Sequence, residues 1–456
     1  MPLYDVVVIG TGTAGQTAAY ELKQRGLEVA VAEKSDTPGG ICALAGCQAK
    51  KWFYEGAELM AKANHLTGKG VTVPPKAEWA DFLNKKNEFT SAVPANTLSG
   101  LKKASIDVLE GQARFIDPKT ILVAGRKISA KNFVIAAGAR PVPLPINGID
   151  HAITSDQFLE LGSLPDRFVF IGGGFISFEF AHFVARLGVG QHRKITILEA
   201  APRPLGPFDS EMVSLLVTAT KEEGVDVHTD VQIAAIEKED DVFRVMTDGD
   251  QAYTADIVVN GAGRVAAIDD LELDKAGVET SRKGISVNAS MQTTQPHIFA
   301  IGDCAETLQL ARVADYEALV AADTIVNKNP AEAFSKMAPA AVPALLFTYP
   351  QYGMLGHTED ALKKKGTAYS KSFGKNLSWP TYRRIGMSHA AYKILVDTDG
   401  QFLGAHVLSD NAAGVINTLR LAMINRIPAQ TLYRQSILSP YPTRESDLLY
   451  MLKPLT

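Results

Sequence analysis

The stretch Tyr4-Asp5-Val6-Val7-Val8-Ile9-Gly10-Thr11-Gly12-Thr13-Ala14-Gly15 decides the fold of this chain. Its apolar run 4–9 predicts a strand that is buried on both faces, and residues 16–25 have the apolar spacing of a helix. A second apolar run, 27–32, ends at Glu33. Strand, glycine motif, helix and strand thus follow within about 30 residues, as in dinucleotide-binding β-α-β units.

Each glycine of the motif has a physical purpose. Gly10 permits the tight turn, Gly12 lets the backbone approach a pyrophosphate, and Gly15 lets the helix pack closely on the strand. The N-terminus of the helix adds a partial positive charge and free N–H groups for phosphates. Glu33 stands 23 residues after Gly10, where a carboxylate can accept ribose hydroxyls.

The same unit occurs again about 160 residues later, which indicates a second dinucleotide-binding module. The apolar run 168–171 leads into Gly172-Gly-Gly174-Phe-Ile-Ser177, a helical stretch to 187 follows, and the run 194–198 ends at Glu199. A carboxylate at this place favours the free 2′-hydroxyl of NADH over the 2′-phosphate of NADPH. Two alternatives to this interpretation stay open. Glu199 could simply face solvent, and the nearby Arg203 could bind the 2′-phosphate of NADPH.

Composition and charge exclude several classes of protein. The chain has 456 residues, of which 46% are hydrophobic and 21% charged, and about three domains are expected. A net charge of −4 provides no basic field for nucleic acid. No apolar stretch approaches a membrane span. A strand that starts near residue 4 leaves no room for a signal peptide, so we expect a cytoplasmic protein.

The chain has three cysteines, too few for a secreted disulfide scaffold. Cys42 and Cys47 are five residues apart, and in a reducing compartment such a pair is expected to be catalytic. Cys304 is most simply a small buried residue. The segment 336–343 is expected to be a linker. After it, strand patterns at 391–396 and 402–407 and a helical run over 410–425 predict an α+β domain.

The sequence resembles the flavin disulfide reductases: glutathione reductase, dihydrolipoamide dehydrogenase and mercuric reductase. The segments that carry this resemblance are 39–51 around the two cysteines, 136–138, 172–179, 260–264, 302–303 and 347–350. The resemblance implies an α/β fold with two Rossmann-like domains, one for FAD and one for NAD, and a C-terminal α+β dimerisation domain. It implies an FAD-binding domain of 1–149 and 266–337, an NAD-binding domain of 150–265 and an interface domain of 338–456.

The resemblance also implies a set of cofactor-binding residues. They are Gly10, Gly12, Ala14, Gly15, Glu33, Lys51, Ala113, Gly138, Gly172, Gly174, Phe175, Ile176, Glu199, Gly263, Asp303 and Ala311. In such proteins Asp303 would hydrogen-bond the ribityl chain of FAD, Ala113 would contact the adenine, and Phe175 would cover the flavin. The expected cofactors are FAD and NAD(H), with NADP(H) as the alternative, and no metal site is expected.

The catalytic residues that the resemblance implies are Cys42, Cys47, Lys50, Glu179 and Tyr441. Cys47 would lie nearest the flavin and Cys42 would face the substrate, with a redox disulfide forming between them. Lys50 and Glu179 would form an ion pair near the flavin, and Lys51 is the alternative lysine.

One segment departs from the family pattern. The family ends in a His-Pro-Thr segment whose histidine acts as acid and base in the partner subunit's site, with a Glu five residues later. Here Tyr441 and Ser446 occupy those two positions, and the last histidine is His406. We expect an NADH-dependent FAD oxidoreductase of an unusual disulfide or dithiol, acting as a homodimer. The alternatives are reduction of a quinone, metal or sulfur species, and a flavin-containing subunit of a larger complex.

Overall fold

The computed structural model describes residues 4–73, 75–187, 193–249, 251–327 and 341–456. The chain divides into two compact units, and each is described by itself. Unit 1 comprises Met1–Trp52, Leu83–Pro143 and Arg264–Met337. Unit 2 comprises Phe53–Phe82, Leu144–Gly263 and Ala338–Thr456. The division into three domains stays a prediction.

A mixed sheet with the strand order β3-β2-β1-β6-β5-β4 forms the centre of unit 1, and β19 also pairs with β6. Its strands are β1 (Tyr4–Ile9), β2 (Val29–Glu33), β3 (Asp107–Glu110), β4 (Ala113–Asp117), β5 (Thr120–Val123), β6 (Arg126–Ile135) and β19 (Ile298–Ala300). The pairs around β1 are parallel, whereas β4, β5 and the first half of β6 pair antiparallel. This arrangement confirms the first predicted β-α-β unit, with β2 beginning two residues later than its apolar run.

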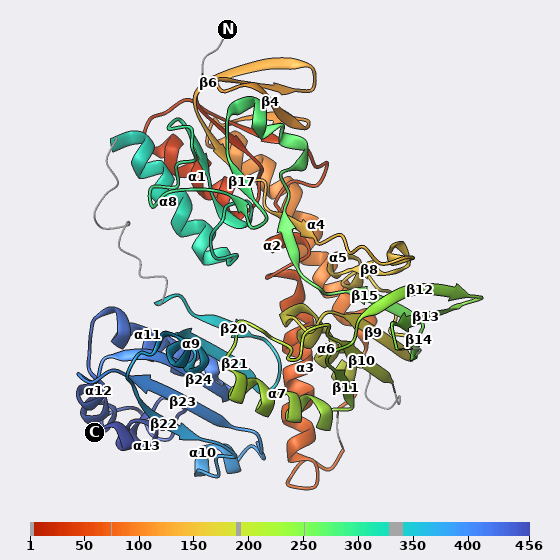
Figure 1. Cartoon of the computed structure of the whole chain (residues 1–456), viewed down its shortest axis with the longest axis vertical. Helices are drawn as coiled ribbons and strands as arrows, with labels where there is room; N and C mark the ends of the chain where they lie inside the picture. Colours follow the sequence, from red (N-terminus) through yellow and green to blue (C-terminus); the bar gives the residue numbers. More distant parts are fainter. Residues whose placement is uncertain (1–3, 74, 188–192, 250, 328–340) are drawn as a thin grey trace. The chain divides into compact units, whose positions relative to one another are not determined.

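Helices α1 and α8 cover one face of this sheet and lie side by side (Figure 1). The helices that contribute to unit 1 are α1 (Thr13–Gln24), α2 (Ile41–Leu44), α3 (Ala49–Leu66), α4 (Trp79–Lys103) and α8 (Ala311–Asn327). Their contact with β1 is made by small and branched side chains with no exposed surface, such as Val8, Ala18, Leu22, Ala318 and Ala321. The smaller strands are β7 (Ala139–Pro141) with β16 (Arg264–Ala266), and β17 (Thr280–Ser281) with β18 (Gly284–Ile285).

A parallel sheet in the order β11-β10-β9-β15-β8 confirms the second predicted module, which belongs to unit 2. Its strands are β8 (Ile153–Thr154), β9 (Arg167–Ile171), β10 (Lys194–Leu198), β11 (Val225–His228) and β15 (Ile257–Asn260). Its helices are α5 (Ser155–Phe158), α6 (Phe175–Leu187) and α7 (Ser210–Glu222). An antiparallel sheet adds β12 (Ile233–Glu239), β13 (Val242–Thr247) and β14 (Ala252–Ala255).

The C-terminal part of unit 2 is an antiparallel sheet in the order β20-β21-β24-β23-β22 with helices packed on it. The strands are β20 (Ala344–Leu346), β21 (Gln351–Gly356), β22 (Ser370–Gly374), β23 (Ala391–Val396) and β24 (Phe402–Ser409). The helices are α9 (Glu359–Lys365), α10 (Pro380–Arg383), α11 (Ala412–Ile424), α12 (Ala429–Ser436) and α13 (Leu448–Leu452). The predicted α+β character is confirmed, while residues 336–340 of the predicted linker lie outside the described residues.

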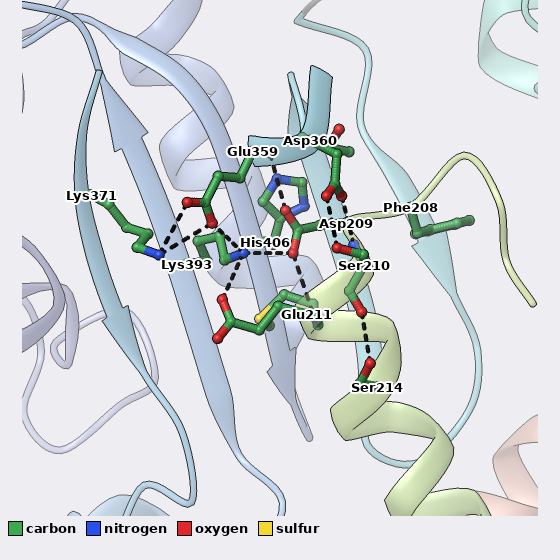
Figure 2. A network of polar contacts seen from close by, with 12 residues as sticks. Phe208, Asp209, Ser210, Glu211, Ser214, Glu359, Asp360, Lys371, Lys393 and His406 are labelled. Atoms are coloured by element: carbon green, nitrogen blue, oxygen red, sulfur yellow. Dashed lines mark hydrogen bonds and ion pairs between the residues drawn. The ribbon is translucent and has the colours of Figure 1, made fainter. Parts of the chain in front are cut away.

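A buried ion cluster joins the start of α7 to this C-terminal sheet (Figure 2). Lys393 on β23 is 1% exposed, and its Nζ lies 2.8–2.9 Å from carboxylate oxygens of Asp209, Glu211 and Glu359. Asp209 also caps α7, because its carboxylate accepts the N–H of Met212. We call these four charged residues, Asp209, Glu211, Glu359 and Lys393, the Lys393 cluster. Within the described ranges, no helix is both long enough and apolar enough to cross a membrane.

Candidate active site

The first glycine loop has the form that a pyrophosphate site requires. Gly10 has a φ of +109°, and a Cβ there would lie 2.5 Å from the carbonyl oxygen of Ala136. A Cβ on Gly15 would lie 2.0 Å from the oxygen of Gly10. Helix α1 begins at Thr13 with no side-chain cap on its N-terminus. The first N–H groups of such a helix have no intrahelical partner, and they can bind phosphate oxygens.

Glu33 lies beside this loop at the end of β2. One of its oxygens accepts the N–H and the hydroxyl of Thr11 at 2.8 and 2.5 Å, and the other accepts the N–H of Ser35 at 2.8 Å. The Thr11 hydroxyl oxygen also accepts the N–H of Gly39 at 3.0 Å. Thr11 was not among the predicted site residues, although its place between two glycines of the motif was a usable signal. It connects the acid to the segment that leads to Cys42.

The other residues predicted to contact FAD lie at turns and strand ends of unit 1. Asp303 is half-buried in a turn after β19, and burial raises the pKa of its carboxyl while Arg264 opposes the rise. Ala113 is buried at the start of β4, and its carbonyl accepts the side-chain amide of Gln112 at 2.8 Å. Gly138 has a φ of +70° after β6, and Ala311 is the first residue of α8.

The two cysteines predicted to be catalytic lie together in unit 1. Cys42 is half-buried in the short helix α2, and Cys47 is exposed just before α3 begins; both are free thiols. Between the two cysteines the chain passes close to the start of α2 at Gly46, where a Cβ would lie only 2.8 Å from the carbonyl oxygen of Ile41. Cys304 is fully buried, as predicted, and its thiol lies within hydrogen-bond distance of the carbonyls of residues 135 and 301.

The surroundings of the two cysteines shift the pKa values of their thiols in opposite directions. A hydrogen bond from Cys42, helped by the positive charges of Lys50 and Lys51, lowers the pKa of Cys47 to about 6. The same hydrogen bond, together with burial, raises the pKa of Cys42, and the hydroxyl of Thr13 partly offsets the rise. The start of α3 also favours a negative charge at Cys47. These surroundings favour the thiolate at Cys47 and the neutral thiol at Cys42.

The second glycine loop has the same geometry in unit 2. Gly172 has a φ of +90°, and a Cβ there would lie 2.5 Å from Cα of Ala262. Ser177 fits in the third glycine position because Gly261 lies opposite, where a Cβ would come within 2.1 Å of the Ser177 hydroxyl. Gly174, Phe175 and Ile176 form the entry to α6, and Phe175 is 49% exposed.

Glu199 is bound to this second loop. Its two carboxylate oxygens accept the N–H groups of Gly173 and Ala201 at 2.6 and 2.7 Å. Arg203, the residue expected as an alternative phosphate ligand, donates to the carbonyls of Leu205, Gly206 and Phe208 at 2.8–3.3 Å. Its guanidinium is thus engaged by its own loop. Gly263, with a φ of +122°, follows β15.

Glu179 is 1% exposed on α6, and its carboxylate accepts the N–H of Phe347 at 2.9 Å. Lys50 and Lys51 belong to unit 1, where both charges act on Cys47. The ion pair of Lys50 with Glu179 stays a prediction, as does the alternative through Lys51.

Tyr441 is 71% exposed in the segment that follows α12. Ser446, at the position of the family's glutamate, exchanges hydrogen bonds with Thr443 at 2.7–3.1 Å and is buried. Exposed apolar side chains precede Tyr441 in the sequence, with Ile437 at 61% and Leu438 at 89%. This segment therefore presents an apolar surface, as an interface between subunits requires.

Two family models cover most of the chain. The model described as pyridine nucleotide-disulphide oxidoreductase matches residues 4–318, and the model of the dimerisation domain of these oxidoreductases matches residues 342–448. Proteins of this kind are FAD-dependent and use NAD(P)H. The presence of the dimerisation domain supports a homodimer.

Characterised proteins of this kind resemble the chain over nearly its whole length. It is 32% identical to a dihydrolipoyl dehydrogenase from Thermus scotoductus, over 98% of this chain and 96% of that one. It is 31% identical to a mercuric reductase from Staphylococcus aureus, over 92% and 77% respectively.

Solved structures show the same architecture. The HOCl-induced flavoprotein disulfide reductase RclA from Escherichia coli superposes with a TM-score of 0.87 at 25% identity, covering 99% of this chain and 100% of that one. Its Cu(II) complex superposes with a TM-score of 0.88 at 26% identity, with complete coverage of both chains. The chain therefore belongs to the pyridine nucleotide-disulphide oxidoreductase family.

Proposed function

We propose that this protein transfers electrons from NADH to a disulfide substrate through the pair Cys42 and Cys47. The observation that carries the proposal is the paired thiols, in which the Cys42 thiol donates to Cys47 and lowers the pKa of Cys47 to about 6. A thiolate at neutral pH is the reactive form of cysteine. Bound FAD would accept hydride from NADH and pass two electrons to the cysteine pair. The first glycine loop, Glu33 and Asp303 would hold it.

The residues of the chain allow a balanced exchange. Cys42, once deprotonated, attacks one sulfur of the substrate disulfide, forms a mixed disulfide and releases a thiolate that takes up a proton. The Cys47 thiolate then attacks the sulfur of Cys42, which releases the second substrate thiol and leaves a Cys42–Cys47 disulfide. Two electrons from NADH restore the two thiols. One NADH, one proton and one disulfide thus give NAD⁺ and two thiols.

Preference for NADH is part of the proposal. The Glu199 carboxylate lies at the second loop, held by two backbone N–H groups, where it would accept ribose hydroxyls and repel a 2′-phosphate. The nearby Arg203 is held by three carbonyls of its own loop, which opposes its use as a phosphate ligand.

A second candidate is the reduction of a metal ion, with the cysteines as the relay. Tyr441 takes the place of the histidine that would deprotonate Cys42, and burial with the Cys47 hydrogen bond raises the pKa of Cys42 further. Disulfide reduction at neutral pH should then be slow. A solved relative is a Cu(II) complex and another relative is a mercuric reductase, which supports a metal ion as an acceptor.

NADH oxidation by the purified protein, followed with a panel of disulfides, quinones and Cu(II), tests both candidates. Cys42→Ser should abolish disulfide reduction, by at least about 10³-fold, because the attacking sulfur is gone. Reduction of quinones should survive this change, since it needs no attack by Cys42. Disulfide reduction that persists in Cys42→Ser would contradict the first candidate.

A further inference from the structure

Glu317 on α8 is a buried carboxyl group that takes no part in the proposed electron transfer. It is 3% exposed, and one of its oxygens accepts the backbone N–H of Gly302 at 2.7 Å. Among the described residues it forms no ion pair with a lysine, arginine or histidine. A carboxylate buried without a cation is costly, so a structural or chemical reason for this residue is required.

The hydrogen bond reaches the turn that carries Asp303. Gly302 has a φ of +67°, and a Cβ there would lie 3.1 Å from Cβ of Ala14 and 3.4 Å from Cβ of Ala314. The turn is therefore pressed between the start of α1 and the face of α8. Glu317 fixes it from the α8 side, and Ala14 belongs to the loop that would bind the pyrophosphate.

The electrostatics around this carboxyl group are unusual for glutamate. Burial raises the pKa of Glu317 to about 7, and the nearby Asp303 adds to the rise. The Thr307 hydroxyl and the Gly302 N–H offset part of this rise. Burial raises the pKa of Cys304, on the same turn, to about 11, so that thiol stays neutral. The side chains that α1 presents here, Ala14 and Ala18, are apolar and buried.

We propose that Glu317 is a positioning residue for FAD: its carboxyl group fixes the Gly302–Asp303 turn, and loss of its proton weakens FAD binding. The inference rests on the proposed role of Asp303 in holding FAD. The pyrophosphate of FAD is negatively charged at every pH of interest, and it would bind at the glycine loop whose Ala14 contacts the same turn. Ionisation of Glu317 would therefore add a charge of the same sign as Asp303 and the phosphates. Above the pKa of Glu317, FAD binding must therefore be accompanied by uptake of one proton.

Release of FAD from the diluted holoenzyme, followed by flavin fluorescence between pH 6 and pH 8, tests this inference. We expect the Kd for FAD to increase up to about tenfold over that range in the parent protein, because the protonated fraction of a group with a pKa of about 7 falls about tenfold. Glu317→Gln keeps an oxygen for the Gly302 N–H but cannot ionise, and its Kd should be nearly constant. Glu306→Gln is the matched control, because Glu306 is exposed close to the same turn and bonds to serines 281 and 286 instead. It should behave as the parent does.

A second measurement needs no variant and covers the case in which Glu317→Gln does not fold. Proton release, recorded with a pH indicator while FAD is stripped from the parent holoenzyme near pH 8, should approach one proton per FAD, because a carboxyl with a pKa of about 7 is then almost fully ionised. No proton release, or an equal pH dependence in the parent and Glu317→Gln, would overturn the inference. A folded protein that carries no FAD at any pH would instead overturn the proposed function.

Discussion

Replacement of Lys393 by methionine tests how much the Lys393 cluster contributes to folding (Figure 2). Methionine has a similar length but no charge, so the change removes the ammonium group that touches three carboxylates at 2.8–2.9 Å. Glu359 would keep Lys371 and the hydroxyl of Tyr369. Asp209, which has no exposed surface, would keep only backbone N–H groups.

The expected loss in the free energy of unfolding is about 3–5 kcal/mol, the range measured when one partner of a buried ion pair is removed. We expect a loss of this size because water is excluded from both partners: the side chain of Asp209 is 0% exposed and that of Lys393 is 1% exposed. Lys363→Met is the matched control, since Lys363 also contacts Glu359 but is 62% exposed. Its effect should be small because water replaces the lost contact. Urea unfolding of the three proteins at neutral pH gives the comparison.

The pH dependence of this loss has a definite sign. Burial disfavours the ionised form of Glu359, but hydrogen bonds from Lys393 and other neighbours outweigh that cost and hold its pKa well below its usual range. Glu359 thus contributes stability above the unfolded-state pKa of about 4.3, and the contribution is lost as the pH falls through the folded-state value. The difference between the parent and Lys393→Met should narrow below about pH 4. Equal stability of Lys393→Met and Lys363→Met at pH 7 would refute the reasoning.

Three further predictions concern the active site. Cys47→Ser should abolish the long-wavelength thiolate–flavin band of the NADH-reduced enzyme. Cys42→Ser should keep a thiolate beside the oxidised flavin, because Lys50 and Lys51 still lower the pKa of Cys47, and should lose its band when acid protonates Cys47. The reverse pattern in absorption spectra would exchange the two roles. Tyr441→Phe should slow the oxidative half-reaction, by up to about 10²–10⁴-fold, and leave reduction by NADH unchanged in stopped-flow measurements; unchanged rates in both would leave Tyr441 a packing role. Glu199→Ala should raise the KM for NADH several-fold and reduce the preference of the enzyme for NADH over NADPH. Steady-state constants that stay unaltered for NADH and for NADPH would exclude Glu199 as the ribose ligand.

The sequence alone was enough to predict the two glycine loops, because a strand, a tight turn and a helix N-terminus are local structures. Gly10 and Gly172 could be assigned to turns without any knowledge of their surroundings, since only glycine readily adopts the backbone angles found there. The places of Glu33 and Glu199 at the ends of their second strands could be predicted because a β-α-β unit has a nearly fixed length. The pairing of Cys42 with Cys47 likewise depends on a short, nearly closed segment.

The tertiary structure decided what depends on contacts between distant segments. Glu317 meets Gly302 across 15 residues, and Lys393 meets Asp209 across 184. No periodicity or spacing predicts such pairs, because burial, which makes their charges important, arises only when whole elements pack together. Glu317 is an ordinary polar residue of a helix in the sequence. Only its burial against the Asp303 turn raises the pKa of its carboxyl.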